Sequence, residues 1–314
     1  MSYADQVFVS MCEDIINNGT DTQGEKVRPK WEDGTPAYTI KRFGVVNRYD
    51  LRKEFPALTL RKTALKSCMD EILWIYQRKS NNIKDLKPHV WDEWADENGS
   101  IGKAYGYQVR ETYGHHKYNF SGLPIENTIN NIRKEYPSAR YTVSGKGWNE
   151  FVALDQIDAV IYDLKNNPFS RRIMTNLYNF RDLKEMNLYP CAYSMTFNVT
   201  NENGKLTLNA ILNQRSQDVL AANNWNVCQY AILLMMIAQV CDMEAGELVH
   251  VIADAHIYDK HVGIIKELIT REQYPAPKVR LNSEIKNFYD FTTDDLIVED
   301  YIAGDQIKNI PIAV

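Results

Sequence analysis

The sequence predicts an α+β domain in which helices pack against a mixed, mainly antiparallel sheet. Strand-like and helix-like segments follow one another without regular βαβ alternation, which argues against a doubly wound fold. Two alternating apolar runs are joined by Asn203-Gly204, a strong hairpin signal. The long segment from Asn226 to Cys241 is apolar on most sides, and this pattern is typical of a helix buried at the centre of a domain.

Hydrophobic periodicity predicts the other elements. Apolar residues recur every three to four positions in the expected helices and every second position in the expected strands. The segment 111–152 loses this periodicity, so we expect an insertion within a single domain that spans residues 1–314. In chain order the expected elements are helix 4–18, strand 38–46, helix 62–78, helix 154–165, strand 173–178, hairpin strands 191–199 and 206–212, helix 226–241, strand 248–253 and helix 259–271.

The composition limits the classes of partner and compartment. The 314 residues are 44% hydrophobic and 25% charged, which is ordinary for a globular protein, and the net charge is −5 without a basic tract. This charge argues against nucleic acid as the main partner and leaves room for a small anion pocket. The five cysteines are odd in number and form no CxxC pair, so neither a disulfide framework nor structural zinc is indicated. No leader sequence and no run of about 18 apolar residues is apparent, so we expect a cytoplasmic protein without a membrane span.

A cysteine and an arginine on the hairpin form a candidate catalytic pair. Cys191 follows Pro190 at the start of the first hairpin strand, and Arg215 follows the second. Strand pairing should carry the guanidinium toward the thiol, where its charge favours thiolate over thiol. The alternative is that Cys191 is a small buried hydrophobic residue, as dispersed cysteines often are.

Four arginines at loop or strand ends, Arg28, Arg171, Arg172 and Arg215, are a candidate phosphate site. They are either scattered solvated charges or, if they converge, a bidentate clamp for a phosphate dianion. Neighbouring residues on a strand point to opposite faces, so only one of Arg171 and Arg172 can face the site of its own chain. The other could reach across a subunit interface.

Two further positions leave alternatives open. Residues 254–261 contain two histidines, two aspartates and a tyrosine, but His256 and His261 are five residues apart without a third ligand nearby, so no metal is expected. His256 and Tyr258 suit hydrogen bonds to sugar hydroxyls, unless an aspartate of this segment simply caps a helix. Glu71 lies in an apolar neighbourhood of helix 62–78, either on the helix surface or in a proton-handling role.

Taken together, these segments resemble the thymidylate synthase family, over most of the chain outside 111–152. Pro190-Cys191 matches the family's nucleophile segment. Gln214-Arg215-Ser216-x-Asp218 matches its phosphate and substrate segment, and Asp254-x-His256-x-Tyr258-x-x-His261 matches its ribose segment. Further matching blocks are Glu71-Ile72-Leu73-Trp74, Trp91-Asp92-Glu93-Trp94, Asn167-Pro168-x-Ser170-Arg171-Arg172 and Pro311-Ile312-Ala313-Val314. The resemblance implies a thymidylate synthase-like α+β fold and a homodimer formed through the sheet.

The resemblance also implies an activity, the reductive methylation of dUMP to dTMP with 5,10-methylenetetrahydrofolate as one-carbon and hydride donor and without a metal. The Cys191 thiolate would add to C6 of the uracil and make C5 nucleophilic. The implied catalytic residues are Cys191, Glu71, Tyr105, Asp218 and Asn226. The implied substrate-binding residues are Arg28, Arg171, Arg172, Gln214, Arg215, Ser216, Asp218, Asn226, His256 and Tyr258, with Arg171 and Arg172 supplied by the partner subunit. The implied folate-binding residues are Trp91, Asp218, Ala222 and Val314.

Two departures from the family pattern keep other outcomes open. Ala192 follows the nucleophile where the family usually has histidine, and residues 221–226, Ala-Ala-Asn-Asn-Trp-Asn, replace the usual Leu-Gly-x-Pro-Phe-Asn beside the folate. Pyrimidine hydroxymethylases of the family differ in this region and let water trap the methylene, so a dUMP 5-hydroxymethylase is one alternative. A non-catalytic nucleotide-binding or RNA-binding regulator is the other. The retained Trp91 and the C-terminal Pro-Ile-Ala-Val favour hydride transfer.

Overall fold

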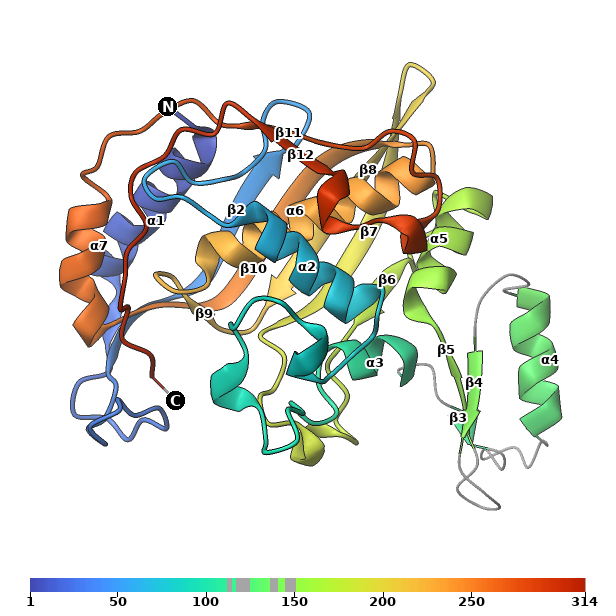
Figure 1. Ribbon diagram of the computed structural model, residues 1–314, viewed down its shortest axis with the longest axis horizontal. Helices are drawn as coiled ribbons and strands as arrows, with labels where there is room; N and C mark the ends of the chain where they lie inside the picture. Colours follow the sequence, from blue (N-terminus) through green and yellow to red (C-terminus); the bar gives the residue numbers. More distant parts are fainter. Residues whose placement is uncertain (112–114, 117–124, 136–140, 145–150, 314) are drawn as a thin grey trace.

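A computed structural model of the 314-residue chain describes residues 1–111, 115–116, 125–135, 141–144 and 151–313. Its centre is a mixed sheet with helices on one face (Figure 1). β10 pairs in parallel with β8 and β9, and the other strand pairs of this sheet are antiparallel, so the predicted fold class is confirmed. The strand order is β1 (Thr20–Asp21), β2 (Thr39–Asp50), β10 (Glu244–Tyr258), β8 (Lys205–Gln214), β7 (Ala192–Glu202) and β6 (Met174–Asn176), with β9 (Gln217–Asp218) beside β10.

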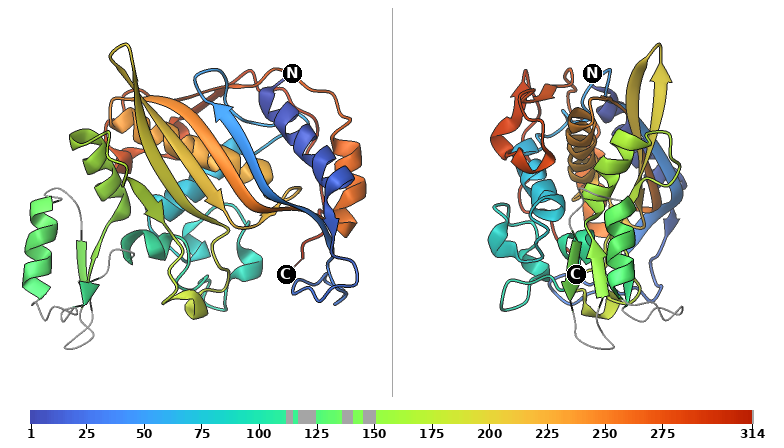
Figure 2. Two further views of the ribbon diagram at one scale, coloured as in Figure 1. Left: turned by 180° about the vertical axis from the view of Figure 1, so that it is seen from behind. Right: turned by 90° about the vertical axis from the view of Figure 1, so that its right-hand side faces the viewer.

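The helix α6 (Asn223–Val240) lies between the sheet and α2 (Leu65–Tyr76), as Figures 1 and 2 show. It is packed on the sheet side against β8 and β10 and on its outer side against α2. Nearly every side chain of α6 is therefore buried, which explains why its sequence is apolar all round and confirms the predicted central helix. α1 (Tyr3–Asn18) packs against β2 and β10 and agrees closely with the predicted helix 4–18.

Two element boundaries differ from the prediction in ways that matter for function. α6 begins at Asn223, so Asn226 lies in its first turn. β10 continues to Tyr258, well beyond the predicted end at 253, because β2 pairs along it on one side and β9 extends the ladder on the other. His256 and Tyr258 therefore project from a strand. The alternative that Asp254 or Asp259 caps a helix is wrong, because Asp254 lies within β10 and Tyr258 is the residue before the 3₁₀ turn. β8, α6 and β10 also form a βαβ unit, which the local sequence patterns did not reveal.

The remaining elements lie around this core. The predicted helix 259–271 is shorter, with a 3₁₀ turn at Asp259–His261 before α7. The segment 111–152 includes α4 and strands of a small separate sheet, and its other residues lie outside the described part of the chain. The bounds are α3 (Gly106–Glu111), β3 (His115–His116), α4 (Ile125–Glu135), β4 (Tyr141–Ser144), β5 (Phe151–Leu154), α5 (Gln156–Asn166), α7 (Val262–Leu268), β11 (Lys278–Leu281) and β12 (Leu296–Glu299), with 3₁₀ turns at Ile83–Asp85, Asp92–Trp94, Leu183–Glu185, Phe288–Asp290 and Thr293–Asp295.

The second face of the main sheet is not covered by any helix that the structure describes (Figure 2). This face carries apolar side chains that are open to solvent, including Val46 on β2, Ile211 on β8 and Met174 on β6. Ile211 on β8 lies opposite Val249 on β10 and Thr196 on β7, and Thr196 in turn lies opposite Met174 on β6. Residues that are paired across neighbouring strands point to the same face, so these side chains share one surface of the sheet. This open face therefore carries exposed apolar side chains among polar ones. Among the described helices, none is both long enough and apolar enough to cross a membrane.

We expect Leu233→Ala to lower the free energy of unfolding by about 2–5 kcal/mol, because it leaves a cavity in the fully buried centre of α6. Urea denaturation at a fixed protein concentration measures this change. Lys266→Ala, on the exposed side of α7, is the control and should change the value by less than about 0.5 kcal/mol. A loss of less than about 1 kcal/mol for Leu233→Ala contradicts the central position of α6.

Candidate active site

Cys191 lies directly before β7, and Arg215 follows β8 beside it. The Arg215 backbone N–H donates to the Cys191 carbonyl at 2.9 Å, and its Nη2 lies 3.5 Å from the Cys191 Sγ. The predicted effect of hairpin pairing is therefore confirmed. The guanidinium is held in place by the carbonyls of Pro190 at 3.0 Å and Tyr189 at 2.6 Å. The thiol thus has a cation at a fixed position.

Cys191 differs from the other cysteines of the chain in its surroundings. The other four are buried, whereas Cys191 is only half-buried. A small hydrophobic residue in the core would have neither the partial exposure nor the guanidinium contact. The structure therefore favours the nucleophile over the alternative of a buried hydrophobic cysteine.

Two opposing effects act on the Cys191 thiol. Burial raises its pKa, while the charges of Arg215 and Arg28 lower it, so Arg215 acts in the predicted direction. Desolvation is the larger effect, so the pKa is raised overall. The thiol must lose its proton as it reacts.

Tyr105 is in direct contact with the nucleophile segment. Its hydroxyl accepts the Cys191 backbone N–H at 3.1 Å, and its ring lies 4.7 Å from that of Trp91. Its φ of 46° is in the left-handed region, which is costly for a residue with a large side chain and is common at functional sites. Burial raises the pKa of Tyr105 well above its usual range, so the phenol stays neutral at physiological pH.

Glu71 is buried at 5% exposure, which excludes the helix-surface alternative. Trp91 donates its indole N–H to Oε1 at 2.9 Å, and Trp225 donates to Oε2 at 2.7 Å. Burial raises the pKa of Glu71, and these two hydrogen bonds oppose that shift, as does the nearby Gln229 amide. A carboxyl group with a raised pKa in a buried, polar-lined position is suited to proton transfer.

The amide of Asn226 is oriented by three glutamines. Gln214 and Gln217 each donate to Oδ1 at 3.2 Å, and Asn226 Nδ2 donates to Gln229 Oε1 at 3.0 Å. Burial lowers the pKa of His250 to about 3, so His250 is neutral and its Nε2–H donates to Gln214 Oε1 at 2.8 Å. This chain of donors fixes which end of the Asn226 amide accepts and which end donates.

Gln214 is 2% exposed, and its side chain is occupied by His250, Asn226 and the Ser216 carbonyl. It therefore lies behind Asn226 and orients it. The sequence motifs did not indicate a role for Gln217 or Gln229. Their spacing is the signal that was available, because Gln217 lies in the same short segment as Gln214 and Gln229 follows Asn226 by one helical turn.

Asp218 connects the sheet to the start of α6. Its Oδ1 accepts the backbone N–H groups of Leu220 and Ala221, each at 3.0 Å, and the Ala222 N–H bonds to its carbonyl at 3.0 Å. Burial by itself raises the pKa of Asp218, but the contact with His261, 3.5 Å away, together with the backbone hydrogen bonds, holds it below its usual range. Asp218 is therefore an ionised acceptor at the end of the sheet.

His256 and Tyr258 lie beside Asp218, because β10 pairs with β9 in a register that places His256 opposite Asp218. His256 Nδ1 is 2.8 Å from Asp254 Oδ1, and the rings of His256 and Tyr258 are 5.0 Å apart. Burial and the charge of Asp218 raise the pKa of Tyr258 to about 12, and Arg28 opposes this. The Tyr258 hydroxyl therefore keeps its proton and can donate a hydrogen bond, which is compatible with the predicted sugar-binding role.

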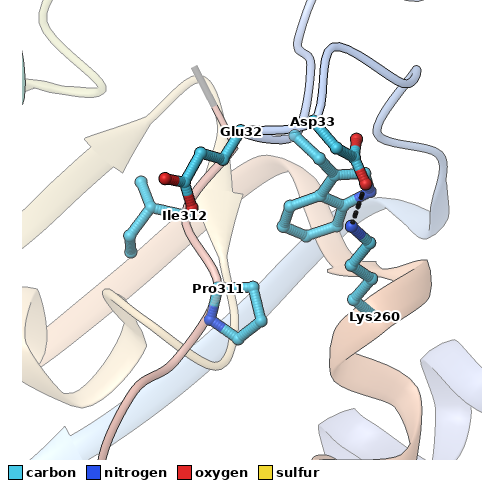
Figure 3. A pocket seen from close by; sticks show the side chains of 6 residues that line it. Glu32, Asp33, Lys260, Pro311 and Ile312 are labelled. Carbon is cyan, nitrogen blue, oxygen red and sulfur yellow. Dashed lines mark hydrogen bonds and ion pairs between the residues drawn. The ribbon is translucent and has the colours of Figure 1, made fainter.

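The C-terminal segment meets the loop 21–34 at the end of β10. His261 Nε2 lies 2.8 Å from the Pro311 carbonyl, and Trp31 Nε1 donates to Asp259 at 3.1 Å. Lys260 pairs with Asp33 at 3.1 Å. A cavity of about 370 Å³ lies between the two segments (Figure 3), lined by Trp31, Glu32, Asp33, Lys260, Pro311 and Ile312. Val314 lies outside the described residues.

The other predicted phosphate ligands are more exposed. Arg28 lies close enough for its charge to lower the pKa of both Cys191 and Tyr258. Arg171 and Arg172 are exposed in the turn before β6, and neither guanidinium bonds to any residue of its own chain that the structure describes. The single chain therefore brings Arg28 and Arg215 toward Cys191 but leaves Arg171 and Arg172 apart. Among the described residues, no group of three or more His, Cys, Asp or Glu side chains converges as metal ligands do.

Comparison with known proteins agrees with this arrangement. A family model described as thymidylate synthase matches residues 6–314. Thymidylate synthase of Bacillus licheniformis is 39% identical over 311 residues, covering 98% of both chains. Thymidylate synthase 1 of Bacillus subtilis strain 168 and thymidylate synthase of Bacillus phage phi3T are each 38% identical with the same coverage.

A solved structure supports the same assignment. The thermostable thymidylate synthase A from Bacillus subtilis superposes with a TM-score of 0.80 at 37% identity, covering 100% of both chains. The similarity extends through the segments that carry Cys191, Arg215 and Asn226. The chain therefore belongs to the thymidylate synthase family.

Proposed function

We propose that the protein catalyses the reductive methylation of dUMP to dTMP with 5,10-methylenetetrahydrofolate as co-substrate. The observation that carries this proposal is the half-buried Cys191 thiol with the Arg215 guanidinium 3.5 Å from its sulfur. The family consists of methyltransferases that use this folate. The relatives named above are thymidylate synthases.

Cys191 is the proposed nucleophile. Its thiolate adds to C6 of the uracil, and the electron pair of the C5–C6 bond moves toward C5 and O4, so C5 becomes nucleophilic. The Cys191 Sγ already lies beside a cation, and substrate phosphate at Arg215 would share that charge. The sulfur leaves again when the 5-methyl product forms.

Asn226 is the proposed reader of the base. The uracil N3–H would replace one of the two glutamine donors at Asn226 Oδ1, and the second N–H of Nδ2 would donate to O4. Cytosine has the reverse pattern at these atoms, so the fixed amide favours uracil. Turning the amide over would break its hydrogen bonds with Gln214, Gln217 and Gln229.

Glu71 and Tyr105 are the proposed proton-transfer groups. Glu71 lies buried with a raised pKa, so it can exchange a proton near O4, directly or through water. Tyr105 lies next to Cys191 and stays a neutral phenol, which suits it to hydrogen-bond the base or a water that removes the proton from C5.

The residues on the Asp218 side fit a reduced folate. An ionised carboxylate is an acceptor for pteridine N–H groups, and the lowered pKa keeps Asp218 in that form. Trp91 supplies an aromatic wall, and Ala222 and the C-terminal residue Val314 complete the proposed folate site. When bound, the folate supplies the one-carbon unit and the hydride.

The active enzyme is proposed to be a homodimer formed through the open face of the sheet. The uncovered apolar surface containing Val46, Ile211 and Met174 supports this, because such a surface is expected to be buried. The exposed Arg171 and Arg172 are proposed to complete the partner's phosphate site together with Arg28, Arg215 and Ser216. His256 and Tyr258 are proposed to bind the ribose.

The whole chain, residues 1–314, is proposed to work as one catalytic domain with 111–152 as an insertion. The family match over residues 6–314 supports this. A cytoplasmic location is part of the proposal, since five free cysteines are suited to a reducing compartment.

A dUMP 5-hydroxymethylase is the second candidate, because residues 221–225 depart from the family pattern beside the folate. In that reaction water attacks the methylene before hydride transfer. If the closed site excludes water, hydride transfer gives the methyl product, and if water enters, it gives the hydroxymethyl product.

Incubation with dUMP and methylenetetrahydrofolate should yield dTMP and dihydrofolate in equal amounts, because the folate supplies the hydride. Mass spectrometry of the nucleotides and the absorbance change of dihydrofolate formation measure the two products. Tetrahydrofolate with 5-hydroxymethyl-dUMP, without dihydrofolate, identifies the hydroxymethylase instead.

Cys191→Ser should lower kcat at least about 10³-fold while dUMP still binds, because a hydroxyl is a far weaker nucleophile than a thiolate. Turnover unaffected by this change contradicts the covalent mechanism, and absence of any turnover in the parent protein points to a binding regulator.

Mixing an Arg172→Ala chain with a Cys191→Ala chain should restore about a quarter of the parental activity after subunit exchange, because one site in each hybrid dimer carries neither change. Each variant alone is expected to be nearly inactive. Steady-state assays before and after exchange, with hybrid formation followed by native mass spectrometry, provide the measurement. Hybrid dimers without recovered activity show that the site is not shared.

A further inference from the structure

The hydrogen bond between Trp225 and Glu71 is not used in any step of the proposed reaction. Trp225 lies in the segment 221–226, where the family usually has phenylalanine at this position. A phenylalanine has no ring N–H, whereas the Trp225 indole donates to Glu71 Oε2 at 2.7 Å. The departure from the family pattern therefore adds a bond to a proposed proton-transfer group.

The two indole donors on Glu71 have different surroundings. Trp91 is buried, and its ring packs against those of Trp74 at 6.0 Å, Trp94 at 5.7 Å and Tyr105 at 4.7 Å. Trp225 is only half-buried, in the first turn of α6. Oε1 therefore has a donor enclosed by other aromatic rings, and Oε2 has a donor that is partly open to solvent.

A third donor lies nearby without a partner. Gln229 is 1% exposed, and its Nε2 forms no hydrogen bond among the described residues. Its amide is close enough to Glu71 to favour the ionised carboxylate. An unpartnered buried amide N–H is available to donate to a further acceptor, such as a water or the O4 of a bound base.

We propose that Trp225 is a positioning residue for Glu71, because its indole N–H fixes the orientation of the carboxylate through Oε2. This inference rests on the proposed function for its catalytic consequence but not for the hydrogen bond itself. Losing the indole N–H leaves Oε2 without that donor. The buried carboxylate then becomes harder to ionise.

Other titratable groups face Glu71 from the elements around it. Asp70 on α2 is paired with Arg78 at 2.9 Å. Cys68 on α2, Tyr105 before α3 and Tyr230 on α6 all have their pKa raised by burial, so they remain neutral through the pH range of interest. Glu71 is thus the group at this position whose charge changes between acidic and neutral pH.

The indole N–H of Trp225 stabilises the ionised form of Glu71, and this determines how its removal changes the free energy of unfolding with pH. Because burial raises the folded-state pKa of Glu71, stability from this group is present below its unfolded pKa and is lost as the pH rises through the folded pKa. The indole N–H favours the ionised form and limits that loss. Removing it raises the folded pKa further, so the variant is more unstable relative to the parent at pH 8 than at pH 5.

Trp225→Phe, which keeps a ring and loses the N–H, tests the proposal by two readouts. The acid limb of the kcat/KM profile should shift upward by about one pH unit, a tenfold change in proton affinity. Independently of activity, the difference between the urea midpoints of parent and variant should widen from pH 5 to pH 8. Trp94→Phe, which touches the Trp91 ring but not Glu71, is the matched control and should do neither.

A double-mutant cycle separates the hydrogen bond from packing. In a Glu71→Gln background, Trp225→Phe should show no pH-dependent change in urea midpoint, because no carboxylate remains to titrate. A pH-independent loss of stability in the parent background, or the same widening in the Glu71→Gln background, overturns the proposal. If the parent protein gives no turnover with dUMP and methylenetetrahydrofolate, the proposed function fails while the stability readout still decides this inference.

The unmodified protein provides a measurement that needs no folded Trp225 variant. With ¹⁵N-labelled indoles, two ring N–H resonances should titrate together with one midpoint. Both shifts should vanish in Glu71→Gln. A single titrating indole contradicts the paired hydrogen bonds and overturns the proposal.

Discussion

The burial of α6 between the sheet and α2 is the constraint on which the site depends. The apolar surface of α6 is covered on both sides, so packing fixes the position and orientation of the helix. This places its first turn at the end of β8. That turn carries Trp225 and Asn226, which meet Glu71 from α2 and Gln214 from β8. A close-packed helix holds the residues of its first turn in fixed positions, because its side chains cannot shift without opening cavities in the core. The polar geometry of the site therefore rests on an apolar contact.

The ionisable groups of the site are buried away from water, and this burial determines the direction of most of their pKa shifts. Desolvation is the largest influence on the pKa of Glu71, Cys191 and Tyr105, and it favours the neutral form of each. Hydrogen bonds and the Arg215 charge act against it at Glu71 and Cys191. Asp218 is the exception, because His261 and the backbone hydrogen bonds of the turn overcome desolvation. The result is a site with proton donors on the nucleophile side and a fixed negative charge on the side proposed for the folate.

The end of β10 connects the regions proposed for substrate and folate. The strand delivers His256 and Tyr258 and then turns at His261, which contacts Asp218 on one side and Pro311 on the other. Trp31, from the loop that carries Arg28, packs against Tyr258 at 5.5 Å and His261 at 5.7 Å. A short path of ring contacts and hydrogen bonds therefore connects the C-terminal segment to the loop with Arg28. Such a path suits a site that has to close around two ligands.

Local sequence patterns determined the fold class, the central helix and the proximity of Cys191 to Arg215. In each case the deciding residues are neighbours along the chain: apolar periodicity for the helix, and the Asn203-Gly204 turn for the hairpin. The motifs also determined the family. The tertiary structure alone decided that β10 continues to Tyr258, that three glutamines orient Asn226, that burial outweighs Arg215 at the thiol, and that Trp225 bonds to Glu71. Glu71 and Trp225 are 154 residues apart in sequence, and nothing local to either one specifies their contact. It exists because α2 packs on α6, and packing and desolvation are properties of the assembled core.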